Sequence, residues 1–172
     1  MANFEEQKYC KIDGITDEAI AGKDLVLCIY NIEGDKLLAV SGQNELEINM
    51  KRDIITLNSK TIKGGWKTNV SGSKEWDMTV DGVYNYTQET HKTLLKIFNG
   101  DGKVCIKVVD QNKLKPVTGG LALLEEYKRT AGAEDSATFS CTLKGLGALV
   151  DLSEMEAPEM PENIKEKKTK GK

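Results

Sequence analysis

The only histidine in the chain, His91, is its one candidate for a general base of the usual type. It falls on the same side of a short predicted helix as Leu94, Leu95 and Phe98, which follow it at helical spacing. A histidine on the apolar side of such a helix is typical of a hydrogen-bonded structural residue. Because no nucleophile is spaced to pair with it, we interpret His91 as structural rather than catalytic.

Two rows of carboxylates are the second candidate, because glycoside hydrolysis uses a pair of acids. Glu45 and Glu47 alternate along one predicted strand, and Asp77 and Asp81 lie along another. Side chains at every second residue share one face of a strand, so these acids form stripes and do not converge on a pocket. We interpret them as solvated strand faces and predict that the protein is not an enzyme.

The sequence gives only weak signals for phosphate or metal binding. The glycine pairs at 64–65 and 119–120 lack the Gly-Lys-Ser/Thr context of a phosphate loop. The four cysteines form no C-x-x-C pair. Cys28, Cys105 and Cys141 lie in apolar strand patterns and are expected to be buried, reduced thiols. The fourth cysteine is Cys10. We predict no cofactor and no metal site.

The charge balance argues against a nucleic-acid-binding surface. The chain has 24 Lys and Arg against 27 Asp and Glu, a net charge of −3, whereas neutralising phosphates requires a basic excess. The lysine-rich stretch 163–172 follows an equally acidic one, 151–162, which favours a solvated tail. No run of about 18 apolar residues is present and the N-terminus is polar, so we expect neither a membrane span nor a secretion signal.

The periodicity predicts a mainly β protein with one helix. Strands are expected over 24–32, 36–40, 43–50, 75–80, 103–110 and 135–144, while 53–57 continues the third strand or begins the next, and 119–127 fits strand or helix. The helix is expected over about 88–98, with Thr87 as N-cap and Gly100 as a left-handed terminal residue. These elements indicate an antiparallel β-sandwich or part-barrel.

The domain organisation follows from where these patterns begin and end. Residues 24–150 form one β domain in this interpretation. Residues 1–23 are expected to form an N-terminal arm that orders only against something else. Residues 151–172 are expected to form a charged C-terminal tail, which is flexible or becomes ordered on assembly.

Two further features indicate a protein that joins copies of itself. The polar segment 58–74 is predicted to be a long loop, and such loops in compact domains tend to be functional. Its Trp66 either packs back on the core or contacts a partner, and both alternatives stay open. The predicted strands have unprotected edges, and joining identical subunits into a ring removes every edge at once. The acidic strand faces would then line a bore.

Four segments carry a resemblance to a known family: TLNSK (56–60), GGWK (64–67), GSKEWDMTVDG (72–82) and DSATFSCTLKGLGAL (135–149). In order and spacing they resemble the major tail (tail tube) proteins of long-tailed bacteriophages, over about residues 20–150. Asn58 stands where that family commonly has threonine or aspartate, and residues 1–20 and 151–172 match no part of it.

The resemblance implies a structural virion protein without catalysis, built as a ring-forming β-sandwich with one helix. Six subunits would form a ring, and their inner strands would join into one barrel. Rings would stack into a tube around a tape-measure protein, with tail terminator and baseplate proteins as further partners. DNA would pass through the lumen without specific binding. Assembly in the bacterial host cytoplasm would place the protein in the virion tail, with the arm and the C-terminal segment as straps between rings.

Candidate functional residues follow from the resemblance and the alternation together. The lumen-lining candidates are Glu45, Glu47, Asn49, Glu75, Asp77 and Thr79. The candidates for the inter-ring loop are Lys60, Lys63, Trp66, Lys67 and Asn69. A bore lined with carboxylates and hydroxyls would repel phosphates, so DNA would not be retained.

Two rival functions stay open on the sequence. The same fold could be the inner tube of a contractile machine, such as a bacteriocin-like particle or a type VI secretion system. A monomeric β-sandwich that binds a ligand or carbohydrate would instead have an apolar pocket with a few convergent polar groups.

Overall fold

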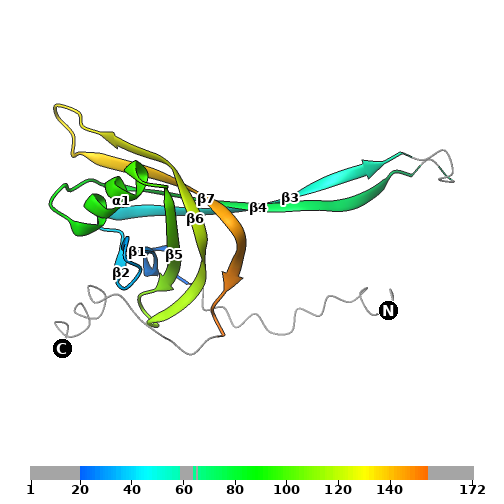
Figure 1. Ribbon diagram of the computed structural model, residues 1–172, viewed down its shortest axis with the longest axis horizontal. Helices are drawn as coiled ribbons and strands as arrows, with labels where there is room; N and C mark the ends of the chain where they lie inside the picture. The colour runs from blue at the N-terminus through cyan, green and yellow to red at the C-terminus, as the bar shows by residue number, and fades with distance from the viewer. Residues whose placement is uncertain (1–19, 59–63, 65, 155–172) are drawn as a thin grey trace.

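The structure, a computed structural model, describes residues 20–58, 64 and 66–154 of the chain. Within these residues the chain forms seven strands and one α-helix (Figure 1). After a 3-10 turn, η2 (Gly22–Asp24), the elements are β1 (Leu25–Tyr30), β2 (Leu37–Ala39), β3 (Gln43–Leu57), β4 (Thr68–Val83), α1 (Glu89–Asn99), β5 (Lys103–Asp110), β6 (Lys115–Thr130) and β7 (Thr138–Asp151). The predicted mainly β class with one helix is confirmed, and 119–127 belongs to a strand.

All seven strands belong to one antiparallel sheet in the order β2-β1-β5-β6-β7-β4-β3. The sheet curls so that the first residue of β3, the last strand in this order, meets β1, which lies near the other end. There the Gln43 side chain accepts a hydrogen bond from Leu27 N (2.8 Å) and donates one to Leu27 O (3.1 Å). Just beyond the end of β2, Val40 N still donates to Leu27 O (2.9 Å), and the Gln43 side chain supplies the partner of Leu27 N. This closure agrees with the predicted part-barrel.

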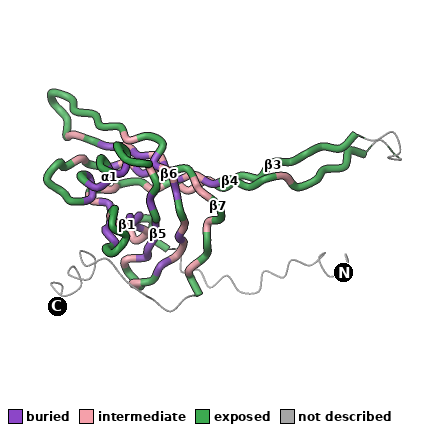
Figure 2. The backbone as a smooth tube through the Cα atoms, viewed as in Figure 1, coloured by how far each residue is buried: buried purple, intermediate pink, exposed green. Residues whose placement is uncertain are grey.

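The main core fills the concave side of this curled sheet and is covered by α1 (Figure 2). Its fully buried members include Leu27, Ile29, Met78, Val80, Leu94, Ile106, Cys141 and Leu143. A smaller cluster on the other side of β1 contains Val26, Cys28, Leu37, Ala39 and Val109. β1 is therefore buried on both faces, which agrees with its continuous apolar sequence.

The helix buries a different stripe from the one predicted. Leu94 and Ile97 are buried, whereas Leu95 and Phe98 are 37% and 46% exposed. The buried positions also include Thr90, His91 and Thr93, so the covered face begins one residue earlier in the helix than apolar spacing indicated. A short helix over a curved sheet contacts it along one narrow stripe, which leaves the flanking apolar residues in solvent.

The helix ends also differ from the expectation. Gln88, not Thr87, is the N-cap, and it makes no side-chain capping bond. Thr87 instead donates to the side chain of Asn85 (2.7 Å), which closes the preceding turn. Gly100 has a φ of −90°, and the left-handed residue is Gly102, at 73°.

The cysteines divide into two kinds. Cys28 and Cys141 are fully buried, and desolvation raises the pKa of each thiol to about 12. Cys105 is exposed, contrary to prediction, because it alternates with Val104 and Ile106, which take the core side of β5. Cys10 lies outside the described residues.

The third and fourth strands are much longer than predicted. β3 continues through 53–57, and β4 begins at Thr68, inside the segment 58–74 that was interpreted as loop. Their paired distal halves project from the rest of the molecule as a two-stranded hairpin (Figure 1), called here the arm and comprising residues 51–75. The rest of the described chain is called the body.

Most of the two predicted terminal segments, 1–23 and 151–172, lies outside the described residues.

Candidate functional site

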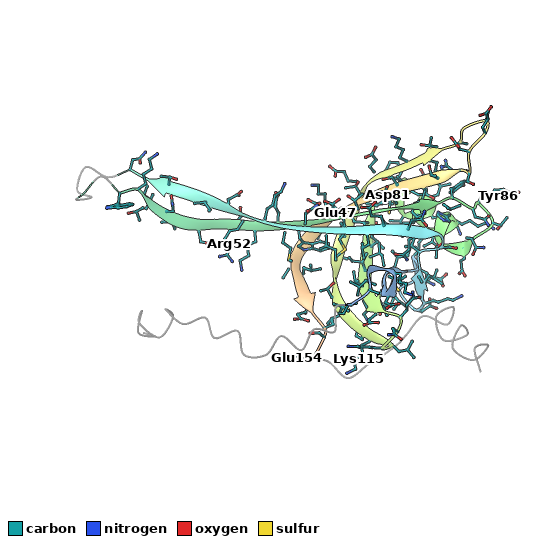
Figure 3. All side chains as sticks on the ribbon, turned by 180° about the vertical axis from the view of Figure 1, so that it is seen from behind. Glu47, Arg52, Asp81, Tyr86, Lys115 and Glu154 are labelled. Atoms are coloured by element: carbon teal, nitrogen blue, oxygen red, sulfur yellow. The ribbon has the colours of Figure 1, made fainter. Side chains whose placement is uncertain are left out.

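The six predicted lumen residues all lie on one face of the β3–β4 pair. In the register, Glu47 is opposite Thr79 and Asn49 is opposite Asp77. The next strand extends these rows, because β7 places Ser140, Thr142 and Lys144 opposite Asp81, Thr79 and Asp77. We call this surface, comprising Glu45, Glu47, Asn49, Glu75, Asp77, Thr79 and Asp81, the carboxylate face. Figure 3 labels Glu47 and Asp81 on it, with Arg52 beyond them at the start of the arm.

Asp77 is the acid of the carboxylate face that contacts both an amide and a lysine. The Asn49 amide donates to Asp77 Oδ1 (3.2 Å) and to Glu47 Oε1 (3.0 Å), and Lys144 Nζ lies 3.3 Å from Asp77 Oδ2. The hydrogen bond from Asn49, with the help of Lys144, holds the pKa of Asp77 below its usual range. The carboxylate is therefore charged at neutral pH. Fixed anions spread along cross-strand rows suit repulsion of a passing anion rather than general acid–base catalysis.

His91 has no free nitrogen for catalysis. Its Nδ1 lies 2.9 Å from the hydroxyl of Tyr127, and its Nε2 lies 3.0 Å from Ser41 O. A carbonyl oxygen only accepts, so Nε2 carries the proton and Nδ1 accepts from Tyr127. The ring packs edge-on against Phe139 and Tyr84, and burial lowers the pKa of His91. These contacts support the structural interpretation.

The arm is fixed to the body by Trp76. This side chain is only 5% exposed, and its indole Nε1 donates to Gly147 O (2.9 Å). A Cβ at Gly145 would lie 2.2 Å from the indole ring, so only glycine leaves room for it there. Trp76 pairs across the strands with Met50, and the next residue towards the tip, Glu75, is exposed. The buried indole therefore marks the point at which the arm leaves the core.

A bulge turns the strands within the arm. Asp53 faces both Gly72 and Ser73, and the Ser73 hydroxyl donates to the Asp53 carboxylate (2.7 Å). A Cβ at Gly72 would meet Asp53 Cβ at 2.9 Å, so the glycine is needed for this close approach. Beyond the bulge Ile55 pairs with Val70, and they are 53% and 44% exposed. The arm thus presents apolar side chains that the described chain does not cover.

The structure places the predicted inter-ring residues in different elements. Trp66 is 81% exposed, so of the two alternatives for it, packing on the core is wrong. Lys67 is exposed beside it. Asn69 lies in β4 rather than in a loop, and its side-chain Oδ1 accepts a hydrogen bond from the Thr56 hydroxyl (2.9 Å). Lys60 and Lys63 lie outside the described residues.

A second exposed aromatic surface was missed by the sequence. Tyr86 is 72% exposed at the end of the molecule opposite the arm (Figure 3). Beside it, Arg129 donates to the Tyr84 hydroxyl (3.1 Å). An open cavity of about 450 Å³ lies there, lined by Tyr84, Asn85, Tyr86, Arg129, Thr130, Ala131 and Ala137. The available signal was an aromatic in a polar turn, the same signal that singled out Trp66.

Over the residues that the structure describes, no cluster of three or more metal-ligating side chains occurs. The helix that they contain is too short and too polar to cross a membrane.

A family model described as phage tail tube protein matches residues 19–151, which is most of the chain. The chain belongs to the phage tail tube protein family. The predicted family is thus confirmed, and with it a tube-forming structural role in the phage tail. No curated protein matches the sequence.

Solved tubes share the fold of this tail tube protein at low sequence identity. A subunit from the tail of an empty gene transfer agent particle is 17% identical, with a TM-score of 0.69, and the match covers 77% of this chain and 98% of that one. The SPP1 tail tube subunit is 18% identical, with a TM-score of 0.68 and 85% of both chains covered. A chain of the PVC sheath–tube complex, from an extracellular contractile injection system, is 11% identical, with a TM-score of 0.54, and the match covers 78% of this chain and 92% of that one.

Proposed function

We propose that this protein polymerises as stacked rings of six subunits, forming the tail tube through which DNA is delivered. The number six rests on the gene transfer agent tail, which was refined with C6 symmetry. The subunit acts as a structural component and carries out no catalysis. It is built in the host cytoplasm around a tape-measure protein and meets terminator and baseplate proteins at the tube ends.

The observation that carries the ring is a pair of free strand edges. β3 is the last strand of the sheet and has a partner on one side only. β6 pairs with β5 only as far as Leu123, so its distal part, Glu125–Thr130, also has a free edge. Unpaired backbone donors and acceptors at such edges favour pairing with another chain.

The strand directions allow these two edges to join around a ring. Along β3, β4, β7 and β6 the direction alternates, because each neighbouring pair is antiparallel. β3 and β6 therefore run in opposite directions within one subunit. Subunits related by rotation about a ring axis keep the same orientation, so β3 of one copy meets β6 of the next as an antiparallel pair. The alternation then continues through every subunit.

The carboxylate face lines the bore of this ring. Its Glu45, Glu47 and Asp77 face the DNA, and Asp77 stays ionised because Asn49 and Lys144 stabilise its charge. A negative wall repels the phosphates, so DNA passes without being retained. The arm, with its exposed Trp66 and Lys67, makes the contact between rings. The N-terminal segment, residues 1–23, and the C-terminal tail, residues 151–172, link neighbouring rings.

The inner tube of a contractile machine is the second candidate function. The fold similarity to the PVC sheath–tube complex favours it, although at a lower TM-score than the two non-PVC tubes described above. The two functions differ in whether a sheath protein is present, and a sheath gene beside this one would indicate the contractile tube.

Electron microscopy of the purified protein tests the proposal. We expect hollow tubes whose end views have sixfold symmetry, and light scattering that rises steeply with protein concentration. A monomer that persists across the concentration series, without tubes at any concentration, would contradict the proposal and favour a monomeric binder.

A further inference from the structure

The arm and the aromatic cavity lie at opposite ends of the molecule (Figure 3). Figure 1 shows the same separation, with the arm extending one way and the β6–β7 turn and α1 lying at the other end. The arm of a subunit cannot reach its own cavity. Two complementary surfaces at opposite ends of one molecule make a head-to-tail contact, which generates an open linear assembly when it is repeated.

We infer that the cavity between Tyr84, Tyr86 and Arg129 is the receptor for the arm of a second copy of this chain, with Trp66 as the inserted side chain. This inference rests on the proposed stacking of rings and names the surface that receives the arm.

The receptor is held rigid by the core beneath it. The guanidinium of Arg129 donates to the Tyr84 hydroxyl and lies 5.5 Å from the centre of the Tyr84 ring. Tyr84 in turn packs edge-on against the buried His91, and its backbone N–H donates to Ala137 O (2.8 Å). Because these contacts already fix Tyr84 and Arg129, the two side chains lose little conformational entropy when a partner binds.

The chemistry of the cavity suits an indole. Its lining includes aromatic rings, a guanidinium and the small side chains of Ala131 and Ala137. Its volume of about 450 Å³ can hold a tryptophan side chain. Trp66 is the most exposed large apolar residue of the described chain, at 81%. Tryptophan, tyrosine and arginine are the residues that most often dominate binding energy at interfaces.

Arg129 in the cavity wall is itself basic and donates to Tyr84, whereas two acids in the adjoining turn have a charge that complements the arm. The arm, residues 51–75, has six basic and two acidic residues, a net charge of +4 in a chain whose total is −3. The turn that borders the receptor carries Glu134 and Asp135, which are exposed and form no ion pair within the described residues. Lys67, next to Trp66, is positioned to meet them. Such charges increase the association rate and favour one orientation of the partner.

Site-directed cross-linking tests the inference directly. In a background with Cys10 and Cys105 replaced by serine, Lys67→Cys is introduced at the arm and Ala131→Cys at the receptor. Assembled material is treated with a short bis-maleimide and separated under denaturing conditions. We expect a ladder that continues past six subunits, because each link joins one ring to the next. Mixing two chains with one cysteine each should give heterodimers only.

The matched control combines Lys67→Cys with Lys115→Cys, since Lys115 is exposed at the base of the molecule, away from the receptor (Figure 3). It should give no cross-link. Normal tubes without a Lys67→Cys to Ala131→Cys link, or a ladder that ends at six, would overturn the receptor and leave the proposed tube intact. Absence of tubes in the serine background and in the wild type would overturn the tube itself.

A double-mutant cycle gives a second measurement. Trp66→Ala and Tyr86→Ala should each raise the lowest concentration that supports tubes by about tenfold or more. The double variant should be little worse than either single variant, because both remove the same contact. Phe98→Ala is the control, as Phe98 is an aromatic exposed on α1 at 46%, and it should leave assembly unchanged. Additive effects of Trp66→Ala and Tyr86→Ala would overturn the contact.

Discussion

The arm and the body are built from the same two strands and depend on different interactions. In the body, alternate residues of β4 are buried, from Trp76 through Met78 to Val80. In the arm, every described residue of β4 before Trp76 is exposed except Gly72, which is half-buried. An isolated two-stranded hairpin is at best marginally stable in water. The buried residues of β4 therefore stabilise the body, whereas under the proposed stacking the arm gains its packing from a neighbouring subunit.

Deletion of the arm tests whether the body folds without it and whether tubes still form. Deleting residues 54–71 leaves the connection Asp53-Gly72-Ser73 between Arg52 and Lys74, which already pair in register. Three-residue hairpin loops with glycine are common, so the shortened strands can still turn. We expect the free energy of unfolding in urea to change by less than about 0.5 kcal/mol, because no core contact is lost. Tubes should be absent by electron microscopy.

The outcome that would contradict this prediction is a folded deletion variant that still forms tubes of normal length. A variant that unfolds would show instead that the arm stabilises the body, which the exposed residues of β4 argue against.

Filling the space under Trp76 attacks the junction between the two regions. Gly145→Ala would place a Cβ 2.2 Å from the indole, so the ring must move. We expect a loss of stability of about 1–3 kcal/mol, the usual cost of overpacking a core. Tryptophan fluorescence should shift to the red as the indole loses Gly147 O and gains water. Gly22→Ala is the matched control, because nothing lies within 4 Å of the Cβ position there.

The body could be predicted from the sequence because its strands bury one face. Phe139, Cys141 and Leu143 alternate with polar residues along 135–144, and all three are buried. The carboxylate face followed from the same rule, since every second residue of 45–49 is polar. Cys105 was predicted wrongly because its strand is apolar on both sides, and only the fold decides which side is covered.

The arm could not be predicted by the same rule. Its strands bury neither face, so nothing in the folded subunit requires alternation there. The bulge opposite Asp53 shifts the pattern by one residue at Gly72 and Ser73, and the segment then resembles a polar loop. The receptor around Tyr86 was missed because Tyr84, Tyr86 and Arg129 come from two segments, which only the β6–β7 hairpin and the end of β4 bring together.

Reversing the charge of the carboxylate face tests the proposed lumen role of this surface of the body. The double variant Glu45→Lys/Glu47→Lys removes the Glu47 acceptor from Asn49 but leaves Asp77 with its partners Asn49 and Lys144. Tubes should form normally, while DNA release from particles slows several-fold at low salt and recovers as salt screens the lysines. The variant Glu33→Lys/Glu154→Lys has the same change in net charge, with Glu33 in the β1–β2 turn and Glu154 at the base of the molecule (Figure 3). Equal slowing in both variants would contradict a lumen role.

The burial of His91 in the body predicts that the stability of the subunit depends on pH. Burial lowers the pKa of His91 in the folded state, whereas in the unfolded chain it is near 6.5. The unfolded state therefore binds a proton first as the pH falls, and stability decreases below about pH 6.5 until the folded pKa is passed. Urea unfolding measured from about pH 7.5 down to about pH 5 should show the decrease in stability. His91→Gln should lose this slope, and a slope that persists would assign it to other groups.

Alanine substitutions compare one side chain of the arm with one of the body, and the arm substitution should have the smaller effect on subunit stability. Ile55→Ala removes a residue of the arm that is 53% exposed, so the stability of the free subunit should change by less than about 0.5 kcal/mol. Leu143→Ala, at a fully buried position, should cost about 2–5 kcal/mol through lost burial and the cavity left behind. In tube formation the ranking should change, because the proposed stacking of rings would bury Ile55 and its partner Val70 against a neighbour. If Ile55→Ala lowers subunit stability as much as Leu143→Ala does, the arm is folded by the subunit itself, and the distinction between the two regions fails.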